Sequence, residues 1–196
     1  MNFNFVFNRL KNLILNPKSE WIAIELEAGT KEELIKKYAI PLMVMVAVCS
    51  IIGDSIFQSR LTFSVAAVVC KAFFVFGIAY AGMYISAIII TELASSFSSK
   101  RDLDACYRLV IYSLSAYYAA SAVTNLLPFL RELNILGLYS LYLFWVGAAI
   151  VLKTPDDNKV GFVVVSNLVI LGVYAILTLI MNAILTGIFG VGLLMK

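Results

Sequence analysis

The sequence contains no histidine and few charged residues, and both shortages narrow what the protein can be. Without imidazole, the common zinc and haem ligand sets and the Ser-His and Cys-His catalytic pairs are excluded. Only 14% of the residues are charged, against about 25% in typical soluble domains. With 62% hydrophobic residues, the composition indicates an integral membrane protein. We expect no enzymatic activity and no cofactor or metal.

Cysteine and basic residues are also too sparse to define a chemistry. Cys49, Cys70 and Cys106 lie in or at the edge of apolar runs and form no CxxC pair, so we interpret them as buried free thiols. The net charge is only +3, and the basic residues are not clustered with aromatic ones. Nucleic acid is therefore not an expected partner.

Five apolar runs are long enough to cross a bilayer. About 20 helical residues, each rising 1.5 Å, span the roughly 30 Å hydrocarbon core. Asp, Glu, Lys and Arg are absent from Asn134 to Leu152, which makes the fourth run especially clear. We predict an all-α integral membrane protein in which residues 38–196 form one bundle of five transmembrane helices, at about 38–58, 63–91, 107–130, 133–152 and 160–192.

Residues 1–37 form a separate N-terminal segment in this interpretation. Met1 to Asn16 is amphipathic: one arc of a helix carries apolar side chains, and Arg9 and Lys11 lie outside that arc. The apolar arc comprises Phe3, Val6, Phe7, Leu10, Leu13 and Ile14. The pattern favours a helix lying in the membrane interface. The alternative is a helix that packs this arc against the rest of the protein.

The basic residues predict the orientation in the membrane. With a cytoplasmic N-terminus, only Arg60, Arg131 and Lys196 fall on the opposite side, and Lys71 lies within a span. An excess of lysine and arginine is typical of cytoplasmic loops, so we expect the N-terminus inside and the C-terminus outside. The cytoplasmic set is Arg9, Lys11, Lys18, Lys31, Lys36, Lys37, Lys100, Arg101, Arg108, Lys153 and Lys159.

Two ionisable residues fall within predicted spans. Asp54 lies near the outer end of the first helix, and Lys71 lies about nine residues into the second. A charge facing lipid alone near a helix centre costs about 2.5 to 3.5 kcal/mol, so a partner is expected. We interpret the two as an ion pair that fastens the helices together. A polar patch along a solute or proton path, and a Lys71 that reaches the surface alone, are the alternatives.

Three asparagines, Asn125, Asn167 and Asn182, are the other strongly polar groups in the spans. Hydrogen bonds between helices are their default role, and a binding site is the alternative. Convergence of all five polar residues on one cavity would favour transport, whereas dispersal would favour a structural role.

Several motifs resemble those of the Yip family (Ypt/Rab-interacting membrane proteins), especially its prokaryotic branch. The clearest is GLYSLYLFWVGAAIVLKTPDDNKVGFVVV, a tyrosine-rich helix followed by a Lys-Thr-Pro-acidic-Lys loop. In the same order come Asn16-Pro17-Lys18 with Trp21, Tyr38 to Pro41, Glu92-Leu93 with Phe97, and Arg108-Leu109-Val110 with Tyr112-Ser113. The resemblance covers nearly the whole chain and implies five membrane helices with a cytoplasmic N-terminus, here in a bacterial cytoplasmic (inner) membrane.

Three departures from the family pattern limit what the resemblance implies. Leu114-Ser115-Ala116 stands where the family often has a proline after Tyr-Ser. The aspartate-leucine-tyrosine-glycine-proline motif and the long cytosolic domain of eukaryotic members are missing. We therefore do not expect a Rab-like partner.

The loop after the fourth run has two interpretations. Thr154 can cap the last helix, with Pro155 at its first position, and Asp156 and Asp157 suit the positive end of the helix dipole. Alternatively, the loop is a cytoplasmic docking patch, formed by Lys153, Thr154, Pro155, Asp156, Asp157 and Lys159.

Two functions from different classes follow. The first is a multi-pass membrane protein that organises or recruits partners, with the lipid bilayer, other membrane proteins or a second copy as its contacts. The second is a small transporter or channel-like permease that uses Asp54, Lys71 and the asparagines. The odd helix count and the absence of an internal repeat argue against the second.

Overall fold

The computed structural model describes residues 3–27, 29–57 and 64–189, and every regular element in these ranges is a helix. In chain order, the elements are α1 (Phe3–Leu15), α2 (Pro17–Glu27), α3 (Lys31–Leu34), the π-helical turn η1 (Ile35–Ala39), α4 (Ile40–Phe57), α5 (Val65–Ser96), α6 (Leu103–Ser113), α7 (Ser115–Leu126), the 3-10 segment η2 (Pro128–Leu138), α8 (Tyr139–Val151) and α9 (Asp156–Phe189).

Four helices in the described ranges are long and apolar enough to cross a membrane, namely Lys31–Phe57, Val65–Ser96, Pro128–Val151 and Asp156–Ile188. They coincide with four of the five predicted runs. The predicted run 107–130 is instead divided at Leu114 into α6 and α7, each too short to span alone. Arg60, Lys196, the junction between the first two predicted runs (residues 58–63) and the end of the last run lie outside the described residues.

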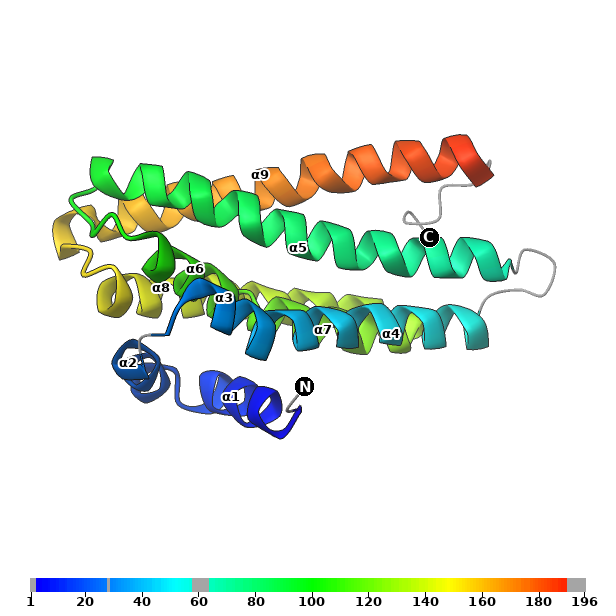
Figure 1. The fold of residues 1–196 in the computed structure, drawn as a ribbon, viewed down its shortest axis with the longest axis horizontal. Coiled ribbons are helices and arrows are strands. Elements are labelled where there is room, and N and C mark those ends of the chain that lie inside the picture. Colours follow the sequence, from blue (N-terminus) through cyan, green and yellow to red (C-terminus); the bar gives the residue numbers. More distant parts are fainter. Residues whose placement is uncertain (1–2, 28, 58–63, 190–196) are drawn as a thin grey trace.

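The helices form two layers with an N-terminal pair outside them (Figure 1). The long helices α5 and α9 run antiparallel and pack on each other. The second layer contains α4, the α6–α7 pair and α8, and α2 packs across α8. The end that carries α2, the turn at 97–102 and the loop at 152–155 is called the loop end below.

Helix starts follow local capping chemistry. The hydroxyl of Thr30 accepts a hydrogen bond from the Glu33 N–H at 3.4 Å, as the capping pattern predicts. At the start of α6, the Asp102 carboxylate accepts one from the Ala105 N–H at 3.1 Å. The Lys100 ammonium lies 2.6 Å from Asp102 and holds the pKa of that carboxyl below its usual range. The carboxylate therefore stays charged and capping to lower pH.

The N-terminal helix packs against the bundle with Val6 and Leu13 of its predicted apolar arc, and Arg9 is buried beside them. Val6, Arg9 and Leu13 are buried, whereas Phe3 and Phe7 are exposed. The expectation that Arg9 lies on the polar outer side is wrong. Its guanidinium turns inward because two carboxylates of α2 are there to receive it: Arg9 lies 2.6 Å from Glu20 and also pairs with Glu27.

A close approach between α4 and α7 depends on Gly53. A Cβ atom at this position would lie 1.9 Å from the backbone carbonyl oxygen of Asn125 on α7. Only glycine therefore lets α4 and α7 pack at this distance. The contact lies one residue before Asp54 in the chain.

We expect Gly53→Ala to destabilise the bundle by about 1 to 3 kcal/mol, the usual cost of overpacking, because the obstruction is backbone. Gly172→Ala is the matched control, since an added Cβ there meets no atom within 4 Å. Unfolding by SDS titration in mixed micelles measures both. Equal midpoints for the two variants would contradict the close contact.

Candidate functional site

Asp54 and Lys71 form the one ion pair between spans in the described chain. The Lys71 ammonium lies 2.9 Å from both carboxylate oxygens of Asp54, and each side chain is about one-fifth exposed. The Ser50 hydroxyl approaches the same carboxylate at 3.5 Å. The predicted pairing of these two residues is thus present, and it joins α4 to α5.

The three asparagines do not converge on this pair. Asn167 donates from its Nδ2 to the carbonyl of Val163 on its own helix, at 2.8 Å. Asn182 is buried, and its Oδ1 has no hydrogen-bond partner among the described residues. The backbone carbonyl of Asn125 packs against Gly53. Within the described part of the chain, Asp54 and Lys71 are the only side chains of the predicted set that bond to each other, and the backbone of Asn125 packs beside them.

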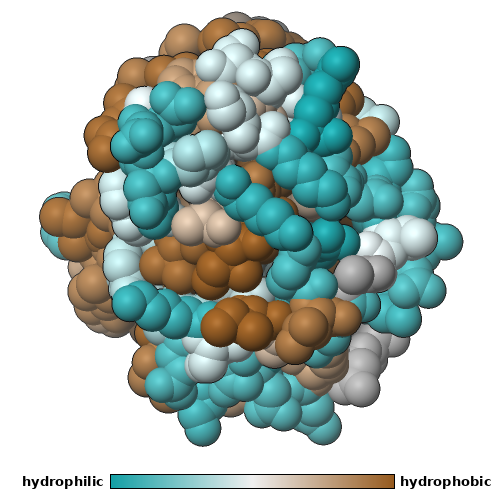
Figure 2. Space-filling model, turned by 90° about the vertical axis from the view of Figure 1, so that its left-hand side faces the viewer, coloured by the Kyte–Doolittle hydropathy of each residue, from teal (hydrophilic) through white to brown (hydrophobic). Residues whose placement is uncertain are grey.

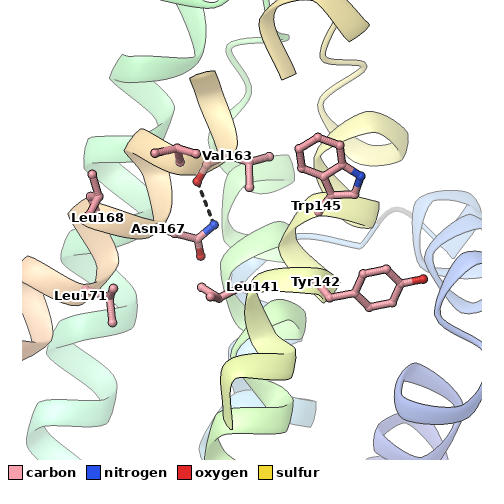
Figure 3. A pocket seen from close by; sticks show the side chains of 8 residues that line it. Leu141, Tyr142, Trp145, Val163, Asn167, Leu168 and Leu171 are labelled. Atoms are coloured by element: carbon pink, nitrogen blue, oxygen red, sulfur yellow. Dashed lines mark hydrogen bonds between the residues drawn. The ribbon is translucent and has the colours of Figure 1, made fainter. Parts of the chain in front are cut away.

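Asn167 lies in a groove between α8 and α9 (Figure 3). The groove has a volume of about 610 Å³ and is almost entirely apolar. The Asn167 carboxamide lies in the space between the two helices, near Leu141. The lining residues are Leu141, Tyr142, Trp145, Val163, Val164, Asn167, Leu168 and Leu171.

A basic residue, Lys159, lies beside the part of the groove that is nearest the loop end. The Lys159 ammonium lies 4.6 Å from the centre of the Trp145 ring, which lines the groove. A cation over the face of an indole is attracted by the ring quadrupole. Lys159 thus lies between the groove and the loop at 152–155, in the first turns of α9.

The loop at 152–155 is bonded to the turn at 97–102. The Ser99 hydroxyl donates to the Thr154 hydroxyl at 2.9 Å, and Thr154 donates to the Ala148 carbonyl at 3.1 Å. The Lys100 N–H donates to the Leu152 carbonyl at 2.9 Å. No hydrogen bond from the first turn of α9 reaches Thr154 within the part of the chain described, so its predicted capping role is wrong.

The backbone explains the different role of Thr154. Lys153 adopts φ 50°, a left-handed conformation, which turns Thr154 back toward α8. Ser98 in the facing turn also has a positive φ, of 55°. The loop therefore holds its shape by hydrogen bonds, while Lys153, Asp156 and Asp157 remain exposed. None of these three has an ion-pair partner among the described residues.

Sequence reasoning missed a polar contact in the middle of the bundle. The hydroxyls of Tyr118 and Tyr174 lie 2.7 Å apart, and each is 3.2 Å from the carbonyl of Ala79. The three residues come from α7, α9 and α5. The tyrosine-rich composition was a signal for this contact, but only packing shows which rings meet.

No group of three Cys, Asp or Glu side chains in residues 3–27, 29–57 and 64–189 could hold a metal ion. The arrangement instead offers two surfaces: the apolar groove between α8 and α9, and the charged, internally bonded loop above it. These can bind other chains or lipid, and neither brings together an acid, a base and a nucleophile.

A family model described as Yip1 domain matches residues 11–180. No curated protein and no solved structure matches the chain. The matched residues run from within α1 into α9 and include the Asp54–Lys71 pair, the groove and the loop.

We expect Asp54→Asn and Lys71→Met to show a coupling of about 0.5 to 3 kcal/mol in a double-mutant cycle. Each single substitution leaves the other residue's charge without its partner in the membrane. The double variant should be less destabilised than the sum of the two single ones. SDS titration in micelles gives the four free energies of unfolding. Strict additivity would show that the pair does not fasten α4 to α5.

Proposed function

This chain belongs to the Yip1 domain family, and we propose on that premise that it is a non-enzymatic membrane protein that organises or recruits partners. Its apolar helices make it an integral membrane protein. The proposal extends to the prokaryotic branch of the family and to a bacterial cytoplasmic membrane.

The single observation that carries this function is the hydrogen-bonded loop with its exposed charges. Ser99, Thr154 and the Ala148 carbonyl form a chain of hydrogen bonds beneath the surface. Asp156 and Asp157 begin α9 on top of it, exposed. A surface that already has its bound shape loses less conformational entropy on binding, which favours docking. Figure 2 shows the loop end as a mainly hydrophilic face interrupted by hydrophobic patches.

The topology proposed is five spans with the N-terminus inside. Four spans are the long helices described above. The remaining one, third in chain order, is formed by residues 103–126 as two consecutive helices, since α7 continues after the single residue Leu114. The Leu114 N–H still bonds to the Val110 carbonyl at 3.0 Å, so the helical path is barely interrupted. Lysine and arginine residues of the turn at 97–102 and the loop at 152–155 support a cytoplasmic loop end.

The N-terminal helix completes the proposed arrangement as an interfacial element. Its buried side is fastened by Arg9, which leaves Phe3, Phe7 and Ile14 exposed. Exposed aromatic and aliphatic side chains beside a membrane bundle are favoured at the boundary between headgroups and acyl chains. α1 would thus fix the depth of the loop end at the membrane surface.

Orientation is tested with single cysteines in a variant whose native cysteines are replaced by alanine. We expect Lys100→Cys to react with a membrane-impermeant maleimide only after spheroplasts are permeabilised, and Phe129→Cys to react without permeabilisation. Both positions are exposed in the structure. Labelling of Lys100→Cys in intact cells would overturn the proposed topology.

Recruitment is tested by crosslinking in native membranes followed by mass spectrometry of what co-purifies with the full chain. We expect a reproducible protein associate whose recovery falls at least about 10-fold on Asp156→Lys with Asp157→Lys, because reversing both charges removes electrostatic complementarity. Glu32→Lys, at another exposed site, is the control. Equal recovery with both variants, or a lone monomer throughout, would count against recruitment by this loop.

A further inference from the structure

The outer face of α9 carries a regular apolar stripe. Val164, Leu168 and Leu171 are 53%, 62% and 57% exposed, and Asn167 lies beside them. Their spacing of i, i+3, i+4 and i+7 places all four on one side of the helix. This is the spacing by which parallel helices interdigitate, and a single asparagine in such a seam sets the register.

Asn167 has hydrogen-bonding capacity that this chain does not use. One N–H of its carboxamide bonds to the Val163 carbonyl at 2.8 Å. The second N–H and Oδ1 have no partner among the described residues. An acyl chain in the groove has no donor to offer Oδ1 at this depth, whereas another asparagine supplies both a donor and an acceptor.

The charged residues at the loop end of one copy are also complementary to those of a second copy. Lys159 lies over Trp145, and the exposed Asp156 and Asp157 precede it by one turn or less. A two-fold axis along the membrane normal keeps two copies at the same depth, so each lysine meets the partner's acidic pair. The same axis brings each groove to the other copy's stripe, because a two-fold interface uses one patch twice.

We propose that the groove between α8 and α9 docks a second copy of this chain in a parallel two-fold dimer centred on Asn167. Leu168 of one copy packs against Leu168 of the other, where the two grooves meet at the axis. The two carboxamides exchange hydrogen bonds across the axis. This goes beyond recruitment through the loop, since it names the partner within the bilayer.

Disulfide crosslinking in native membranes tests the proposal, again without the native cysteines. We expect Leu168→Cys to give mostly crosslinked dimer on treatment with copper phenanthroline. Ile89→Cys is the matched control: it is exposed on α5 and lies at a similar depth, because Gly82 on that helix faces Tyr174 on α9. No dimer at Leu168→Cys, or equal dimer at both positions, would overturn the proposal.

The asparagine is tested by the dimer dissociation constant of the labelled full chain in liposomes, measured by energy transfer. We expect Asn167→Leu to raise this constant by roughly 3- to 30-fold, the range for interhelical hydrogen bonds, and Asn167→Gln to stay near wild type. An unchanged constant for Asn167→Leu contradicts the central role of the carboxamide. A monomer with retained phospholipid in native mass spectrometry would instead assign the groove to lipid. A monomer that still captures its loop-dependent associate would refute the dimer alone.

Discussion

The hydrocarbon core offers no water to satisfy polar groups, and the placement of polar side chains in this fold follows from that constraint. Lys71 reaches Asp54 at 2.9 Å, and Asn167 bonds within its own helix. Tyr118 and Tyr174 share the Ala79 carbonyl. Each solution is local, so no continuous polar path forms among these groups.

The loop end follows different physics because water is available there. Charged side chains need no partner to be tolerated, and Asp156, Asp157 and Lys153 have none among the described residues. What this end does require is a fixed backbone, which Ser99 and Thr154 provide through side-chain hydrogen bonds. In the proposed function, this short loop and the groove beneath it are the surfaces that bind partners.

Several features were predictable because they depend on local chemistry. Thr30 caps α3 by a bond to a residue three positions on, and Asp54 meets Lys71 because an isolated charge is costly in the membrane. Arg9 was misplaced because its burial depends on Glu20 and Glu27, residues of another helix. Thr154 was misassigned because the left-handed conformation of Lys153 leaves no mark in the pattern. The break at Leu114 falls where family members often have proline, although the sequence has none there.

The sequence by itself determined the class, the family and four membrane-length helices, since hydropathy and motifs act over neighbouring residues. Tertiary structure alone decided which partners the asparagines and tyrosines find. Gly53 against the Asn125 carbonyl, the Tyr118–Tyr174 contact and the groove beside Asn167 all join residues far apart in the chain. Their geometry is set by how closely whole helices pack, and packing depends on many side chains at once.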